Sequence, residues 1–178
     1  GDGVLDDGEV SDTTDAQGGF RLVGGSGNIV MTGGTDVSTG LAFEGILIAP
    51  AEASVITPLT SLIGKMVADG NATNNADAEA KLAAATGITA SLATALTASG
   101  ASSLLHFDPV DQSVAGTASA IYVMAAGVRV QNSIDILASA IVGAQQGDAE
   151  TDTIPAMNAA FSAMAAATAR GGERPKNP

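Results

Sequence analysis

The composition of the chain changes near Pro50, and this change constrains the fold more than any other feature of the sequence. Residues 1–50 are rich in Gly, Thr and Asp, whereas residues 57–170 are rich in Ala and Leu. Gly and Asp favour turns between short strands, while Ala and Leu favour helices. The sequence therefore predicts a β-structured region followed by a helical region.

Short apolar stretches between Gly-rich turns define the expected strands of the first region. They are Phe20–Val23, Asn28–Thr32 and Leu41–Ala49. Strands of this length, joined by such turns, suggest a small sandwich. Aromatic residues make up only 3% of the chain, so the core must be built from small side chains and close backbone approach.

Capping residues mark the expected helices of the second region. Thr57 is a favourable N-cap, Pro58 suits the first helical position, and Gly70 is placed to end that helix. Further helices are expected over residues 76–86, 90–99, 117–146 and 153–169. The long fourth helix carries an apolar stripe that contains Ile121, Met124, Val128, Ile134, Leu137 and Ile141.

The first nine residues, GDGVLDDGE, match the second half of a calcium-binding loop of the form D-x-[DN]-x-[DN]-G-x5-E. Asp2, Asp6 and Glu9 fall at ligand positions of that loop. Asp12 and Asp15 are placed to add oxygens from the next turn. Calcium prefers hard oxygen ligands, and carboxylates closely spaced on a tight turn supply them. We expect a structural calcium ion here, and the alternative is a solvated acidic turn.

The charge balance excludes several classes of partner. Lys and Arg number 7 against 19 Asp and Glu, so the net charge is −12, which argues against nucleic acid and anionic membrane surfaces. The absence of Cys excludes a disulfide scaffold, a Cys–zinc site and a Cys nucleophile. No apolar run is long enough to predict a membrane span. The composition suits a protein that meets divalent cations.

Several motifs follow one another along the chain: GDGVLDDGE, TTDAQGGFRL, TGGTD, TGLAFEGILIAP, VITPLTSLI, SLLHFDPV and AAGVRVQNSIDILASAI. Their order resembles a module of very large secreted or surface proteins of Gram-negative bacteria. These proteins are adhesin-like and are often exported by type I secretion. The first part is similar to the prealbumin-type sandwich of surface B-repeat and carboxypeptidase-regulatory-like domains. The resemblance implies an extracellular or cell-surface location and a sandwich whose first strand is missing from this chain.

Together these features predict an α+β fold with two subregions and a linker. Residues 1–55 are expected to form a small Gly-rich antiparallel β-sandwich, without its first strand and with the acidic calcium turn. Residues 56–172 are expected to form a four- or five-helix Ala/Leu-rich bundle, and residues 173–178 an exit linker.

The expected function is that of a non-enzymatic structural or adhesion module, stabilised by calcium, in a large bacterial surface, secreted or biofilm-matrix protein. Its partners would be other domains of that protein or neighbouring subunits. One alternative is a filament or matrix subunit that accepts a donated strand at the open sandwich edge. Another is calcium-dependent self-processing at the Asp108–Pro109 bond.

Other polar features favour structural roles over chemistry. His106 is the one His of the chain, and no nucleophile motif accompanies it. Pro109 is expected to start the next element, and Thr35 and Asp36 to belong to a turn. Two Ala-rich helical stripes are expected to pack in the core, with a self-association face as the alternative. Their members are Ala118, Ala125, Ala126, Ala138 and Ala140, and Ala159, Ala160, Ala163 and Ala167.

Overall fold

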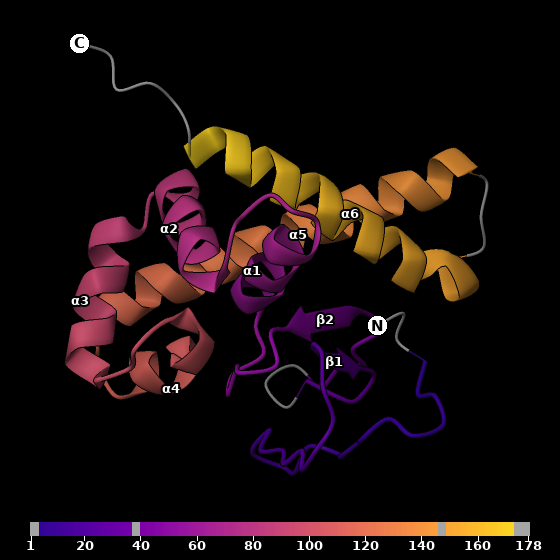
Figure 1. Cartoon of the computed structure of the whole chain (residues 1–178), viewed down its shortest axis with the longest axis horizontal. Helices are drawn as coiled ribbons and strands as arrows, with labels where there is room; N and C mark the ends of the chain where they lie inside the picture. Colours follow the sequence, from indigo (N-terminus) through magenta and orange to yellow (C-terminus); the bar gives the residue numbers. More distant parts are fainter. Residues whose placement is uncertain (1–3, 37–39, 146–148, 173–178) are drawn as a thin grey trace.

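A computed structural model describes residues 4–36, 40–145 and 149–172 of the chain (Figure 1). It is mostly helical, with 57% of its residues in helices. The helices are α1 (Pro58–Ala68), α2 (Asn75–Thr86), α3 (Thr89–Ser99), α4 (Pro109–Val114), α5 (Ala118–Gln145) and α6 (Ala149–Gly172), with a 3-10 turn η1 (Leu104–His106). The strands β1 (Ile29–Thr32) and β2 (Ile46–Ala49) pair antiparallel.

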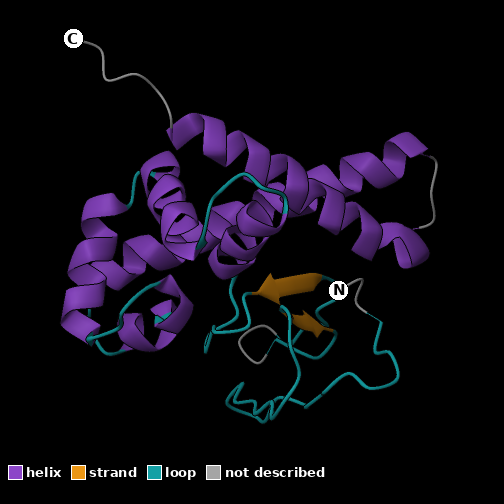
Figure 2. Cartoon of the chain, in the orientation of Figure 1, coloured by secondary structure: helices purple, strands orange, loops and turns teal. Residues whose placement is uncertain are grey.

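The prediction of a β-sandwich is wrong. The described residues form only one sheet of two strands, which lies below the helices in Figure 2. The predicted strand Phe20–Val23 does not form, because the Arg21 N–H donates to the Asp12 carboxylate, 2.6 Å away, and not to a neighbouring strand. In place of a second sheet, β2 packs against α1 and touches α6.

The ends of α1, α2, α3 and α5 agree with the sequence prediction to within two residues, whereas α6 begins at Ala149, four residues before the predicted start, and the number of helices also differs. Thr57 caps α1 through a reciprocal capping box with Thr60, and Pro58 is its first residue. Gly87 ends α2 in the left-handed conformation. The structure contains six helices among its described residues, not four or five. The short α4 is the unexpected helix, since six residues show no periodic pattern to detect.

A buried hydroxyl joins the sheet to the helices. The N–H of Ile48 donates to Ser61 Oγ at 3.0 Å, and this hydroxyl donates in turn to the Thr57 carbonyl at 2.8 Å. Because the Ile48 N–H points away from β1, the bond caps the outer edge of β2. All four residues of β2 are buried as a result of this docking.

The buried face of the long helix α5 mixes small residues with branched apolar ones. Its buried face consists of Ala120, Val123, Ala126, Gly127, Val130, Ile134 and Ala138. Small residues allow close helix contact: a methyl group on Gly127 would already touch Leu59 of α1 at 3.8 Å. The predicted apolar stripe is therefore only partly buried. Ile134 lies in the core, whereas Ile121 and Val128 remain 50% and 52% exposed.

Within the two Ala-rich stripes, Ala126, Ala138 and Ala160 are buried, which agrees with their expected role in the core. Other members of the stripes face solvent, for example Ala140 and Ala163. In each stripe, therefore, only the alanines on the buried side of the helix take part in close helix packing.

Replacing Ser61 with Ala should destabilise the fold, because the buried Ile48 N–H loses its acceptor. We expect the free energy of unfolding to fall by about 1–3 kcal/mol, measured by urea denaturation followed by circular dichroism. Ser133→Ala is the matched control, since Ser133 also donates to the carbonyl four residues earlier but accepts no second bond. It should cost less than about 0.5 kcal/mol. Equal losses in the two variants would contradict the role of Ser61.

Candidate functional site

Residues 4–27, which we call the arm, contain turns but neither helix nor strand. Apart from Phe20 and Leu22, every residue of the arm is exposed. Most of the arm runs along the outside of the sheet, on the side away from the helical layer (Figure 1). The arm carries most of the predicted calcium ligands, so its conformation determines which of these side chains lie close enough to share an ion.

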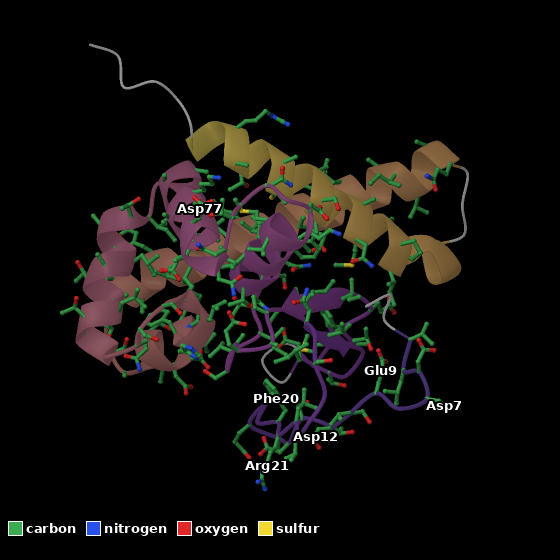
Figure 3. The ribbon with its side chains drawn as sticks, viewed as in Figure 1. Asp7, Glu9, Asp12, Phe20, Arg21 and Asp77 are labelled. Atoms are coloured by element: carbon green, nitrogen blue, oxygen red, sulfur yellow. The ribbon has the colours of Figure 1, made fainter. Side chains whose placement is uncertain are left out.

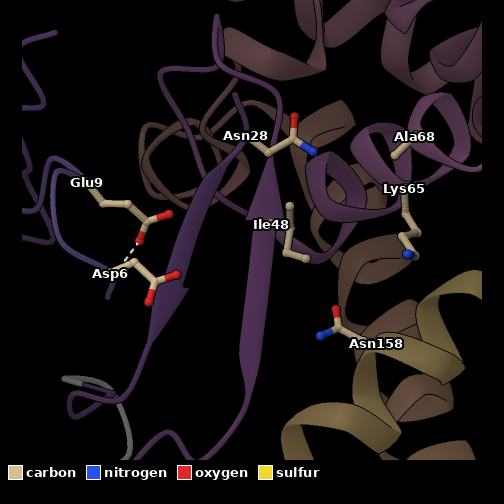
Figure 4. A pocket seen from close by; sticks show the side chains of 7 residues that line it. All are labelled: Asp6, Glu9, Asn28, Ile48, Lys65, Ala68 and Asn158. Carbon is tan, nitrogen blue, oxygen red and sulfur yellow. Dashed lines mark hydrogen bonds between the residues drawn. The ribbon is translucent and has the colours of Figure 1, made fainter. Parts of the chain in front are cut away.

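A cleft of about 590 Å³ lies where the arm, the sheet and the helices come together. We call it the arm cleft. It is lined by Asp6, Glu9, Asn28, Ile48, Lys65, Ala68 and Asn158. Figure 4 shows the two carboxylates of the arm on one side and the side chains from α1 and α6 on the other. The lining is mainly polar, and it includes carboxylate, amide and ammonium groups.

A tight turn holds the two acidic residues of the arm cleft together. The N–H of Asp6 donates to Glu9 Oε2 at 3.0 Å, and the N–H of Glu9 donates to the Asp6 carbonyl at 3.1 Å. On the opposite side, Lys65 forms an ion pair with Asp69 at 3.2 Å on the surface of α1. The cleft therefore has two carboxylates on one side. On the other side lies the Lys65 ammonium, whose charge is partly balanced by Asp69.

The other predicted calcium ligands do not join this pair. Figure 3 places Asp12 beside Phe20 and Arg21, on a different stretch of the arm from Glu9. Asp15 accepts from the N–H groups of two residues within its own turn, at 2.9 and 2.8 Å. Asp2 lies outside the described residues. Asp12 and Asp15 thus stabilise the arm itself.

The described residues alone do not complete a calcium site. No group of three or more Asp, Glu or His in the described part of the chain is arranged to hold a metal ion. Asp6 and Glu9 provide two neighbouring carboxylates, which suit calcium chemically but are fewer than a closed site needs. A calcium ion at this turn would need further oxygen ligands besides those of Asp6 and Glu9.

The polar features of the helical region take structural positions. His106 Nδ1 lies 3.1 Å from Ser54 Oγ on the surface. Asp108 caps α4 by accepting from the N–H groups of Val110 and Asp111, so Pro109 starts the next element as expected.

Thr35 and Asp36 lie near the tip of the β1–β2 hairpin. Thr35 pairs with Ala42 in an isolated bridge, and the Asp36 N–H donates to the Leu41 carbonyl. These contacts agree with the expected turn. Neither residue lines the arm cleft.

Glu79 is a half-buried carboxylate that the sequence does not single out. Its Oε2 accepts from the Leu104 N–H at 2.7 Å and so ties α2 to η1. Burial raises the pKa of Glu79, and the hydrogen bond from Leu104 offsets part of this rise. Nearby, the hydrogen bond from the Thr73 N–H and the ammonium of Lys81 lower the pKa of Asp77. Glu79 thus connects α2 to η1, whereas Asp77 holds the segment before α2 against that same helix.

The chain matches no family model, and comparison with curated proteins and with solved structures finds no significant match either. Among the described helices, none is both long and apolar enough to cross a membrane. The resemblance to surface-protein modules therefore stays a prediction.

Glu79 should make stability depend on pH. Because its pKa is raised in the folded state, its favourable contribution is complete below its unfolded pKa and is lost as pH rises through the folded pKa. Glu79→Gln keeps an oxygen acceptor for Leu104 but cannot ionise. Relative to wild type, this variant should gain stability as pH rises from about 3.5 to about 7, measured by urea denaturation at each pH.

A second variant separates the charge of Glu79 from its role as an acceptor. Glu79→Ala leaves the Leu104 N–H without this partner, so it should be less stable than Glu79→Gln at every pH. A difference between wild type and Glu79→Gln that stays constant across the pH range would contradict the account.

Proposed function

We propose that the chain is a non-enzymatic structural module of a large extracellular bacterial surface or secreted protein. The observation that carries this proposal is the use of its polar side chains. Glu79, Asp108 and Ser61 each bind backbone N–H groups and thereby join or cap secondary-structure elements. In these contacts the three side chains serve as connections or caps of the fold.

The connector after β2 shows the same use of polar contacts. The N–H groups of Ser54 and Val55 both donate to the Leu105 carbonyl, at 2.9 and 3.2 Å. The hydroxyl of Ser54 also meets the ring of His106. Glu52 binds Asn75 at the start of α2. Such contacts fix how the sheet and the helices connect, as a spacer or display module requires.

The arm supports a role for calcium in this module. Asp6 and Glu9 are already paired on one turn, and the loop spacing adds Asp2 as a third ligand. Calcium at this turn would lower the repulsion between neighbouring carboxylates and order the arm beside the sheet. We therefore propose a structural calcium ion, bound by the arm, as a property of the functional module.

A second candidate role is acceptance of a strand from a neighbouring chain or segment. Within the described part of the chain the sheet has two strands, and β2 is covered on its outer side by Ser61 of α1. The remaining edge belongs to β1, whose residues are only partly buried. An edge of this kind is able to pair with an added strand. This role would make the module a subunit of a filament or matrix.

Limited tryptic digestion tests the proposed calcium site. Arg21 is exposed within the arm, so cleavage after it reports whether the arm is ordered. Millimolar calcium should slow this cleavage relative to chelator. Cleavage after the exposed Arg170 near the end of α6 should not respond, and it corrects for any effect of calcium on trypsin.

The protection should depend on the paired carboxylates. Asp6→Asn combined with Glu9→Gln should abolish the effect of calcium at Arg21, whereas Glu44→Gln, at an exposed glutamate outside the arm, should leave it intact. Equal cleavage with calcium and with chelator in wild type would contradict the calcium proposal. In the same samples, a break at Asp108–Pro109 detected by intact mass would contradict the non-enzymatic role.

A further inference from the structure

The loop between α1 and α2 contains the sequence Asp69-Gly70-Asn71-Ala72-Thr73. We call these five residues the acceptor loop. Asn-x-Thr, with any residue except Pro in the middle, is the pattern at which sugars are attached to an asparagine amide. An Asn-x-Thr or Asn-x-Ser pattern occurs once in the chain, at Asn71. The carboxylate of Asp69 extends it to Asp-x-Asn-x-Thr, the longer form that bacterial transferases of this kind prefer.

The backbone of Asn71 is held in place, whereas its side chain is not. Gly70 follows α1 in the left-handed conformation, and the Asn71 N–H donates to the Met66 carbonyl at 2.8 Å, as in a common closing motif of helices. The Asn71 carbonyl accepts from Lys81 Nζ of α2 at 3.1 Å. Within the described part of the chain, the side-chain amide of Asn71 makes no hydrogen bond. A substituent on this amide therefore breaks no polar contact of the fold.

Solvent reaches most of the acceptor loop. Asp69, Gly70 and Thr73 are exposed, and Asn71 is partly exposed. Ala72 is buried and anchors the loop to the core. A glycan is bulky and strongly hydrated, so it needs open space beside the asparagine that carries it. A surface loop between two helices supplies this space.

The contacts of the folded loop indicate when a sugar would be attached. The N–H and the hydroxyl of Thr73 lie 2.9 and 3.2 Å from Asp77 Oδ2 of α2. Ala72, on the other side of this threonine from α2, is buried. A transferase must reach the peptide around Asn71, including the Thr73 hydroxyl that belongs to the pattern. Attachment therefore takes place before the loop docks on α2, while the chain is being exported.

We propose that Asn71 is a glycosylation site whose donor is an oligosaccharide carried on a polyprenyl diphosphate. In the transfer, Asn71 Nδ2 bonds to the anomeric carbon of the first sugar, while the bond from that carbon to the diphosphate oxygen breaks. Nδ2 loses one of its two protons to a base of the transferase, and the polyprenyl diphosphate leaves. The site rests on the proposed function, because only an exported chain meets this donor.

Expression in a bacterial host that supplies an N-oligosaccharyltransferase and its lipid-linked glycan tests the site. The chain is directed to the periplasm by an added signal peptide. Intact mass should show one glycan on wild type, and tandem mass spectrometry should place it on Asn71. Asn71→Gln should abolish the modification. Asn132→Gln is the matched control, since Asn132 is exposed but is not followed by a Ser or Thr two residues later, and this variant should be modified like wild type.

Two substitutions of Thr73 separate recognition by the transferase from folding. Thr73→Ala removes the hydroxyl that completes the pattern and should abolish the modification. Thr73→Ser keeps a hydroxyl and should retain most of it. Circular dichroism should show the same helix content with and without the glycan, because the Asn71 amide makes no contact that the glycan would break. Loss of helix content on modification would contradict the site.

A wild type that carries no glycan, in cells where a control acceptor protein is modified, would overturn the proposal. A glycan that persists in Asn71→Gln would overturn it as well. Because the signal peptide is added and calcium plays no part in the transfer, neither result bears on the proposed structural role. Tryptic digestion with calcium and with chelator tests that role separately.

Discussion

The hydrogen bond from the Ile48 N–H to Ser61 Oγ is the contact on which the arrangement of sheet and helices depends. A two-stranded sheet has too little apolar surface to be stable alone. Here α1 supports β2, because Ser61 accepts the hydrogen bond from the Ile48 N–H that a further strand would otherwise accept. The same hydroxyl donates to the Thr57 carbonyl, so the start of α1 and the edge of β2 are held by one side chain. The hairpin is therefore part of the helical core, and the arm beyond it remains exposed.

Most helix ends were predicted well from the sequence, because neighbouring residues largely determine where a helix begins and ends. Thr57 with Pro58 and the left-handed Gly87 determine where α1 begins and α2 ends, with little influence from distant residues. The sandwich was predicted wrongly because alternating apolar residues at Phe20–Val23 do not reveal that Asp12 will capture the Arg21 N–H. The bond forms because turns of the arm bring Asp12 close to the Arg21 N–H. Strand propensity carries no information about that approach.

The buried face of α5 and the lining of the arm cleft are determined by contacts between segments that are distant in the sequence. Such contacts cannot be predicted from the periodicity of apolar residues. Large apolar residues such as Ile121 and Val128 dominate the helical periodicity, yet they remain about half exposed, while Gly127 lies on the buried face of α5. Asp6 and Glu9 were found from their loop spacing. Lys65 and Asn158, which come from two helices, carry no local signal that they share a cleft with the arm. The core therefore combines alanines with large residues such as Phe107 and Phe161, while several large apolar residues of α5 stay exposed.

Native-state hydrogen exchange, measured residue by residue by NMR, tests most directly whether the hairpin belongs to the helical core. The Ile48 amide should exchange with a protection close to that of Leu62 and Ile63 in the middle of α1, since all three would open only when the core unfolds. Amides of the arm should exchange far faster. If Ile48 exchanges at the rate of the arm amides while α1 stays protected, the sheet is not anchored by Ser61, and the account of the fold is wrong.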